Sequence, residues 1–428
     1  MRLTPVGAGL LTAAVSSLVL SVPPASAAEA IPCTNVDAST ERSATTTPSL
    51  PIEALGAARA TELLRRRGIT PGEGITVAVV DSGVNVSASP MAPVDVREQM
   101  SFGVGGPVEF GQGTNLAGLV AGGPREDGQP TGVAPAAQIV DVQVYGEPLD
   151  SGALDVPEEN VLDALRWLVD NAESEDIGVV VIAFDVDDSR ELERAVRDLM
   201  AHDVVVVAAA GDRPAEGHPG FEELGGGPTP GEDVAGTIHP AAYDGVLGVT
   251  STAQGVPSDG GAGTQAAASV LLSSDVDVAV PTYGAVTLAP NGATCAIDPI
   301  SSVAATGIAT GVVALVRSAF PDENVAQVLA RVTVTATGVS GAPSTATGAG
   351  VIQPVEALTQ KLDPDEAGGV DDMPREESEP ERITAPEPEQ DPVAGALKAA
   401  RWWGLVGGGV LVVALLARPL LARRRQPG

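Results

Sequence analysis

Short runs rich in valine and isoleucine alternate along this chain with stretches whose apolar residues recur at helical spacing. The apolar runs lie at residues 75–80, 138–144, 178–183, 204–210 and 246–249. Between them, residues 161–171 and 191–200 place their apolar side chains on one helical face. Strands that are apolar on both faces and alternate with helices are typical of a parallel sheet that helices cover on both sides. The pattern predicts a doubly wound α/β fold with a mostly parallel sheet.

The first residues of the chain follow a different pattern. A basic start at residues 1–2 precedes an apolar stretch at 6–22 and a small-residue motif at 25–27. These are the three parts of a secretory signal peptide, so we predict a cleaved signal peptide over residues 1–27. The alternative is an uncleaved anchor, which the prolines at 23–24 and the alanine-rich exit disfavour.

A second apolar stretch lies near the other end. Tryptophans at 402–403 precede the mostly apolar residues 405–421, and arginines follow directly after them. About twenty residues of helix span the hydrocarbon core, tryptophans favour its interface, and clustered arginines favour the cytoplasm. We therefore predict one transmembrane helix over 399–422, a cytoplasmic basic tail at 423–428, and an outer location for everything before the helix. A buried core helix is the alternative.

Composition divides the rest of the chain. Residues 362–398 combine acidic pairs with frequent prolines and predict an extended linker, because such a segment buries too little apolar surface to become ordered. The charge of this segment could instead bind a basic partner, but a solvated spacer is the simpler interpretation. Before it lie an N-terminal extension at 28–51 and an outer domain at 52–361, which is within reach of one α/β sheet.

Charge and cysteine content narrow the classes of function. The formal net charge of −32 argues against binding nucleic acid, whose recognition needs a basic surface. Cys33 and Cys295 are the two cysteines of the chain, and an even number in an exported protein suggests a disulfide. This disulfide would hold the N-terminal extension against the body of the outer domain.

Polar residues follow several of the predicted strands, at the sheet edge where open α/β folds bind ligands. Asp81 ends the first apolar run, and Asp212 follows the sharp turn after residues 204–210. A glycine-rich segment surrounds Gln112, and a small-residue helix begins at Ser302. Ser302 could instead be a helix cap, and Asp81 a strand-end turn former.

The order and spacing of these segments resemble the subtilisin family of serine proteases over nearly the whole outer domain. The catalytic residues of that family follow the order aspartate, histidine, serine, and Asp81 and Ser302 stand at the first and third positions. The signal peptide, the cysteine-bearing extension, the acidic linker, the C-terminal span and the segment 320–358 resemble the mycosins of type VII secretion systems. The resemblance implies an extracytoplasmic serine endopeptidase whose partners are membrane components of such a system.

The same resemblance shows departures at the positions that carry catalysis. Gln112 stands where the family has the histidine that takes the proton from the serine, and a carboxamide cannot act as a base. Asp212 stands where the family has an asparagine that donates to the oxyanion, whereas a carboxylate only accepts. The serine motif and the substrate-lining strand also differ, at residues 300–306 and 182–186. We expect a catalytically impaired site.

The three histidines of the chain are weak candidates for a replacement base. His202 precedes a strand, so we expect it at the opposite edge of the sheet. His239 begins a segment that leads into another strand, where we expect a structural role. His218 follows Asp212 in the chain and is the histidine that we expect nearest to the active edge.

Two functions remain. The first is a non-catalytic, mycosin-like homologue that acts by binding, as a structural component of a type VII secretion complex. The second is an active serine endopeptidase with an atypical site that processes secreted substrates. A carbohydrate-binding module is disfavoured, because aromatic residues make up only 3% of the chain. We expect no cofactor; calcium enters only by analogy with the family, because the sequence shows no convincing ligand cluster.

Overall fold

The computed structural model describes residues 31–40, 45–85, 94–125, 128–149, 153–254, 262–338, 342–370 and 394–422. The chain divides after Asp371 into two compact units. The first unit holds the sheet, and the second holds helix α11 (Ala394–Ala422). The predicted signal peptide at 1–27 and basic tail at 423–428 lie outside the described residues.

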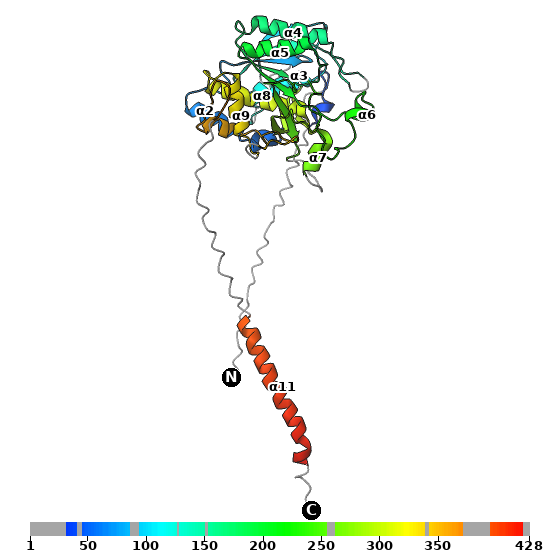
Figure 1. The fold of residues 1–428 in the computed structure, drawn as a ribbon, viewed down its shortest axis with the longest axis vertical. Coiled ribbons are helices and arrows are strands. Elements are labelled where there is room, and N and C mark those ends of the chain that lie inside the picture. Colours follow the sequence, from blue (N-terminus) through cyan, green and yellow to red (C-terminus); the bar gives the residue numbers. More distant parts are fainter. Residues whose placement is uncertain are drawn as a thin grey trace, which may run out of the picture. The chain divides into compact units, whose positions relative to one another are not determined.

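The first unit packs helices and strands together (Figure 1). Seven strands form its main sheet, in the spatial order β2, β3, β1, β4, β5, β6, β7. Their bounds are Thr76–Asp81 (β1), Asp95–Ser101 (β2), Gln138–Gln143 (β3), Ile177–Ile182 (β4), Val205–Ala209 (β5), Leu247–Thr252 (β6) and Val278–Pro281 (β7). All neighbouring pairs are parallel, which confirms the predicted α/β fold. Strands β3 and β4 flank β1, so the direction in which successive strands are added to the sheet reverses at β1. Open α/β sheets bind ligands at the carboxyl ends of the strands at such a reversal, and the carboxyl end of β1 lies there.

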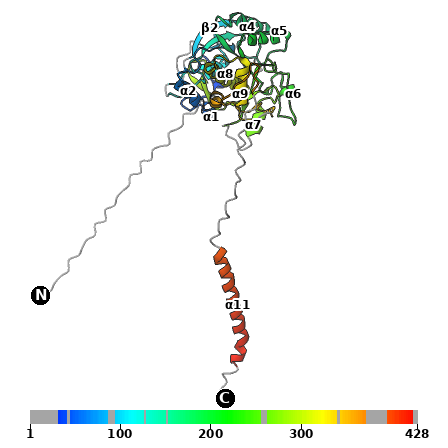
Figure 2. The same cartoon turned by 60° about the vertical axis from the view of Figure 1, so that its left-hand side comes forward.

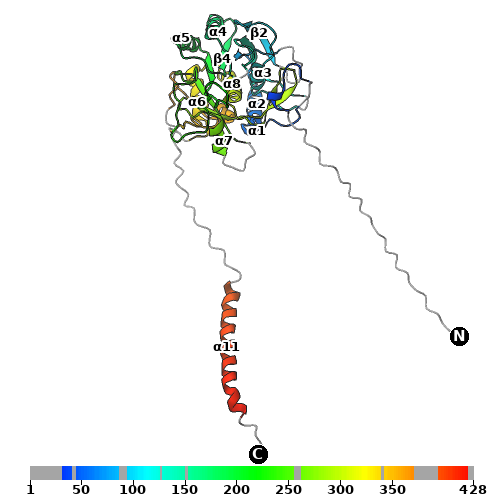
Figure 3. The ribbon, with the colours of Figure 1, turned by 90° about the vertical axis from the view of Figure 1, so that its right-hand side faces the viewer.

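Helices cover both faces of the sheet, as Figures 2 and 3 show. They are α1 (Leu50–Ala54), α2 (Ala57–Arg66), α3 (Gln112–Ala121), α4 (Glu158–Asn171), α5 (Arg190–Ala201), α6 (Phe221–Leu224), α7 (Ala262–Ser269), α8 (Ser302–Ala319), α9 (Val325–Val334) and α10 (Pro354–Thr359), with the short turn η1 (Cys33–Asn35). The apolar sides of α4 and α5 pack on one face, and those of α2, α3, α8, α9 and α10 pack on the other. The two helical stretches predicted from periodicity are α4 and α5.

Helix α8 is the central helix of its face, and nearly all of its 18 residues are buried. Its glycines allow close contact, since a Cβ at Gly307 would lie 3.0 Å from Leu116 and one at Gly311 would lie 2.7 Å from Val133. Interiors this dense hold their helices in one position. Helices α3 and α8 both begin at the carboxyl edge of the sheet, so their packing positions the residues that start them.

Within the described residues, α8 is the helix that is long and apolar enough to cross a membrane. Most of it is buried inside the first unit, so it is the core helix of the domain. Among the residues of α11 whose side chains are described, an apolar stretch lies at 400–416, and its large apolar side chains are exposed. The transmembrane helix at 399–422 therefore stays a prediction.

The sequence pattern missed four strands. The edge strand β2 reads Asp-Val-Arg-Glu-Gln-Met-Ser and is largely exposed, so it carries no apolar run. Strand β7 and the antiparallel pair β8 (Ala285–Leu288) and β9 (Thr294–Ile297) have four residues each, too few for a clear period. The predicted strands lie where the structure has them, with shifted ends.

The N-terminal extension lies against the domain. Cys33 and Cys295 form a disulfide with an S–S distance of 2.06 Å. Further along, the Thr45 hydroxyl donates to the Thr294 carbonyl at 2.8 Å, and the Arg125 guanidinium donates to the Thr45 carbonyl at 2.7 Å. One covalent bond and several polar contacts therefore attach the extension to β9 and its surroundings.

The domain continues past its predicted end at residue 361. Leu362 is buried, and the Asn324 side chain at the start of α9 donates to the Glu366 carbonyl at 3.0 Å. Residues 362–370 are therefore ordered against α9, and the predicted start of the linker at 362 is wrong. An acidic composition does not prevent docking where a helix start offers amide donors to backbone carbonyls.

The disulfide gives a first prediction. Replacing both cysteines by serine should lower the free energy of unfolding by about 2–5 kcal/mol, because the bridge joins residues 262 positions apart and restricts the unfolded chain. Urea denaturation followed by circular dichroism measures this change, and Cys33→Ser alone should match the double variant. A loss below about 0.5 kcal/mol, the usual range of surface substitutions, would contradict a stabilising bridge.

Candidate active site

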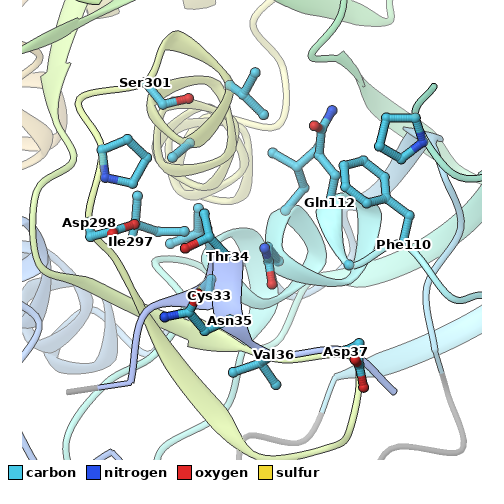
Figure 4. A pocket seen from close by; sticks show the side chains of 18 of the residues that line it. Cys33, Thr34, Asn35, Val36, Asp37, Phe110, Gln112, Ile297, Asp298 and Ser301 are labelled. Carbon is cyan, nitrogen blue, oxygen red and sulfur yellow. The ribbon is translucent and has the colours of Figure 1, made fainter. Parts of the chain in front are cut away.

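Four predicted site residues lie at the carboxyl edge of the sheet. Asp81 ends β1, Gln112 begins α3, Asp212 follows β5, and Ser302 begins α8. Gln112, Asp212 and Ser302 line a cavity of about 730 Å³. Gln112 and Asp212 also line a second cavity, of about 760 Å³, together with Ser301 (Figure 4). Because Gln112 and Asp212 line both cavities, the two cavities form one cleft.

Asp81 is fully buried and accepts three hydrogen bonds. The Ser82 amide and the Tyr145 hydroxyl donate to Oδ1 at 2.7 and 2.9 Å, and the Gln112 Nε2 donates to Oδ2 at 3.0 Å. Burial raises the pKa of the Asp81 carboxyl, although these hydrogen bonds favour its charged form. Asp81 is therefore the centre of a buried polar network.

Sequence reasoning missed Tyr145, which closes this network. Its hydroxyl oxygen accepts from the Gln112 Nε2 at 2.9 Å while it donates to Asp81. Both hydrogens of the Gln112 amide nitrogen are therefore used, one on Asp81 and one on Tyr145. A signal was present in the sequence, because Tyr145 follows an apolar strand at the edge where the other polar residues gather.

Asp212 binds the first residues of α8. Its Oδ1 accepts from the Ser302 backbone amide at 2.6 Å, and its Oδ2 accepts from the Ser301 hydroxyl at 2.8 Å. Burial raises the pKa of the Asp212 carboxyl, and the hydrogen bonds from Ser302 and Ser301 oppose that rise. The positive end of α8 also attracts this carboxylate. An amide that could receive an oxyanion is thus already bound to a side chain of the same chain.

The Ser302 hydroxyl oxygen is buried and has no hydrogen-bond partner within the described part of the chain. Ser302 is the first helical residue of α8, and Ser301 precedes it with extended backbone as the N-cap. The alternative that Ser302 serves as the helix cap is therefore wrong. A serine hydroxyl becomes a nucleophile when a neighbouring base takes its proton, and none of the described histidines contacts this hydroxyl.

The histidines do not supply that base. His202 is exposed at the end of α5, before the amino end of β5, as expected. His239 is buried, with its ring beside Tyr243 and its backbone amide on Asp185. His218 lines the same cavity as Ser302, but its Nδ1 accepts from the Gly220 amide at 3.1 Å and the Ser302 hydroxyl contacts none of its atoms.

The contacts of the site differ from those that acyl transfer uses. Acyl transfer needs a base on the nucleophile and free donors for the oxyanion. Here the amide at the histidine position cannot titrate, and the carboxylate at the asparagine position occupies a donor. Removal of the base has cost about a millionfold in turnover in a subtilisin. Among the described residues, no group of three or more histidine, cysteine, aspartate or glutamate side chains could hold a metal ion.

A family model places this architecture among known proteins. The model of the subtilase family, Peptidase_S8, matches residues 72–350. The chain therefore belongs to the subtilase family, as the order of its motifs predicted.

The most similar relatives narrow that assignment. Mycosin-1 of Mycobacterium tuberculosis is 28% identical over 82% of this chain and 82% of the relative. Mycosin-3 of the same organism is 28% identical over 83% of this chain and 81% of the relative. The solved structure of MycP3 protease from the type VII (ESX-3) secretion system is 26% identical, covers 75% of this chain and 90% of its own, and has a TM-score of 0.54. The chain is similar to mycosins along most of its length.

The half-buried carboxylate of Asp212 gives a second prediction. Burial raises its pKa above the ordinary value of 3.8, so its contribution to stability is full below that value and is lost as the pH rises through the folded-state pKa. Asp212→Asn removes this titration and keeps an acceptor for the Ser302 amide. We expect the variant to lose less stability than the native chain between pH 4 and pH 7.

Urea denaturation at both pH values measures this difference. Asp170→Asn, at an exposed position of α4, removes one charge outside the site and serves as the control. Parallel stability profiles for the native chain and Asp212→Asn would contradict the prediction.

Proposed function

We propose that this chain is a catalytically inactive subtilase that acts by binding, at the outer face of a membrane, as a structural component of a type VII secretion complex. The observation that carries the proposal is the contact between the Asp212 carboxylate and the Ser302 amide at 2.6 Å. The contact occupies an amide that would otherwise be free to donate to an oxyanion. The hydroxyl of the same serine has no histidine partner within the described residues.

The cellular role is proposed from the relatives and from the ends of the chain. A solved structure to which this chain is similar is described as coming from a type VII secretion system. The predicted signal peptide at 1–27 and transmembrane helix at 399–422 support an anchored, extracytoplasmic domain. The buried polar networks around Asp81 and Asp212 support a stable scaffold, because satisfied networks add rigidity to a core.

The alternative is an active endopeptidase with an atypical site. It would require a group that takes the proton of Ser302 and a donor that replaces the family's asparagine. Among the described residues, no histidine contacts Ser302, and a carboxylate that accepts from the Ser301 hydroxyl stands at the asparagine position, so the binding role is the better supported proposal.

A fluorophosphonate probe tests inactivity directly. The native chain should label no faster than its own Ser302→Ala variant. The double variant Gln112→His, Asp212→Asn should label at least about a hundredfold faster than this background, the effect of one restored oxyanion donor. The same double variant with Ser302→Ala is the matched control and should stay unlabelled. Labelling of the native chain that Ser302→Ala abolishes would overturn the proposal.

Secretion in the organism that encodes the chain tests the binding role. Loss of the protein should reduce export by the proposed secretion system, and the Ser302→Ala variant should restore export as fully as the native chain. If the native chain restores export and Ser302→Ala does not, catalysis rather than binding is required.

A further inference from the structure

The cleft is open although the family's catalytic groups are replaced. Its two cavities meet at Gln112, Asp212 and Val303, which line both. Cavities of this size, about 730 and 760 Å³, are large enough for several side chains of a ligand. The two walls of the cleft differ in chemistry, and this difference indicates what the cleft can bind.

The first cavity is mostly apolar. Its wall includes Leu149, Leu154, Phe184, Ile238 and Leu271. Ser302 lies beneath this cavity, and its fully buried hydroxyl has no hydrogen-bond partner among the described residues. Arg213 also lines it, but its guanidinium is paired with Glu232 and donates to the Ala267 carbonyl. The cavity therefore suits an apolar side chain with its polar backbone.

The second cavity is acidic. Its wall includes the carboxylates of Asp37, Glu109, Glu147, Asp212 and Asp298. Figure 4 shows Asp37 and Asp298 on either side of η1. Among the described lining residues there is no lysine, arginine or histidine. None of the five carboxylates forms an ion pair with another described residue.

We propose that this cleft binds an extended basic peptide segment of a partner protein, with an apolar side chain in the first cavity and lysine or arginine side chains in the second. A groove lined by one sign of charge concentrates its potential on the ligand, so cationic segments are attracted and acidic ones repelled. The charge of Asp212, which opposes an oxyanion, favours this ligand. The inference rests on the proposed function, because a bound segment persists only if it is not cut.

Fluorescence anisotropy of labelled decapeptides with the full chain in detergent tests this proposal. One peptide combines leucine with arginine, the second replaces each arginine by glutamate, and the third replaces each arginine by serine. We expect the arginine peptide to bind at least about tenfold more tightly than the serine peptide, and the glutamate peptide not to bind. Raising NaCl from about 20 to about 300 mM should weaken the arginine peptide severalfold.

Charge variants locate the site. Glu109→Gln, Glu147→Gln, Asp298→Asn together remove three exposed carboxylates of the cleft and should weaken the arginine peptide about tenfold. Glu173→Gln, Glu191→Gln, Asp198→Asn remove as many exposed carboxylates on or beside α4 and α5, and should leave the affinity unchanged. Leu149→Asn should weaken binding at both salt concentrations, because it acts on the apolar wall.

The outcomes separate this inference from the proposed function. Equal binding of the arginine and glutamate peptides, or equal loss in the two charge variants, would overturn the basic-peptide site. Mass spectrometry of the same samples detects cleavage, which would overturn the inactive state while the initial anisotropy still reports binding. Intact peptides that fail to bind would refute the peptide site alone.

Discussion

The burial of α8 between α3 and the sheet is the constraint on which the rest of this site depends. Close contacts at Gly307 and Gly311 fix the position of α8 against its neighbours. Its first amide therefore points to a fixed place at the carboxyl edge of the sheet, where a helix end stabilises negative charge. Asp212 supplies this charge from within the chain. A helix start that could stabilise a reaction intermediate is used here to hold a side chain.

The substitutions in the site form contacts of their own. The Gln112 amide nitrogen binds both Asp81 and the Tyr145 hydroxyl, so the buried carboxylate keeps three donors. Asp212 likewise accepts from both serines at the start of α8. Leaving such groups buried without partners would cost about 1–3 kcal/mol each. Gln112 and Asp212 therefore stabilise the folded state through their hydrogen bonds. Catalysis would require a residue that exchanges protons at the first position and one that donates to an oxyanion at the second.

Much of the fold could be predicted from the sequence, because the central strands are apolar on both faces and α4 and α5 have clear periodicity. The edge strand β2 could not, since its exposure removes the apolar signal. The placement of Asp81 and Ser302 followed from motif order alone. The partners of these residues did not, because Tyr145 reaches Asp81 from 64 positions away and Asp212 reaches Ser302 from 90 positions away. The order of 362–370 was also hidden, as composition does not report docking on α9.

The bridge between Cys33 and Cys295 links the structure of the cleft to the redox state of the compartment that surrounds the protein. Cys33 and its neighbours in η1 form part of the wall of the acidic cavity (Figure 4), and the bridge attaches that wall to β9. Thiols remain reduced in the cytoplasm and pair in oxidising compartments. In the proposed extracytoplasmic role, a newly made chain would lack this attachment until export. The oxidation of one cysteine pair would then complete the wall of the acidic cavity only outside the cytoplasm.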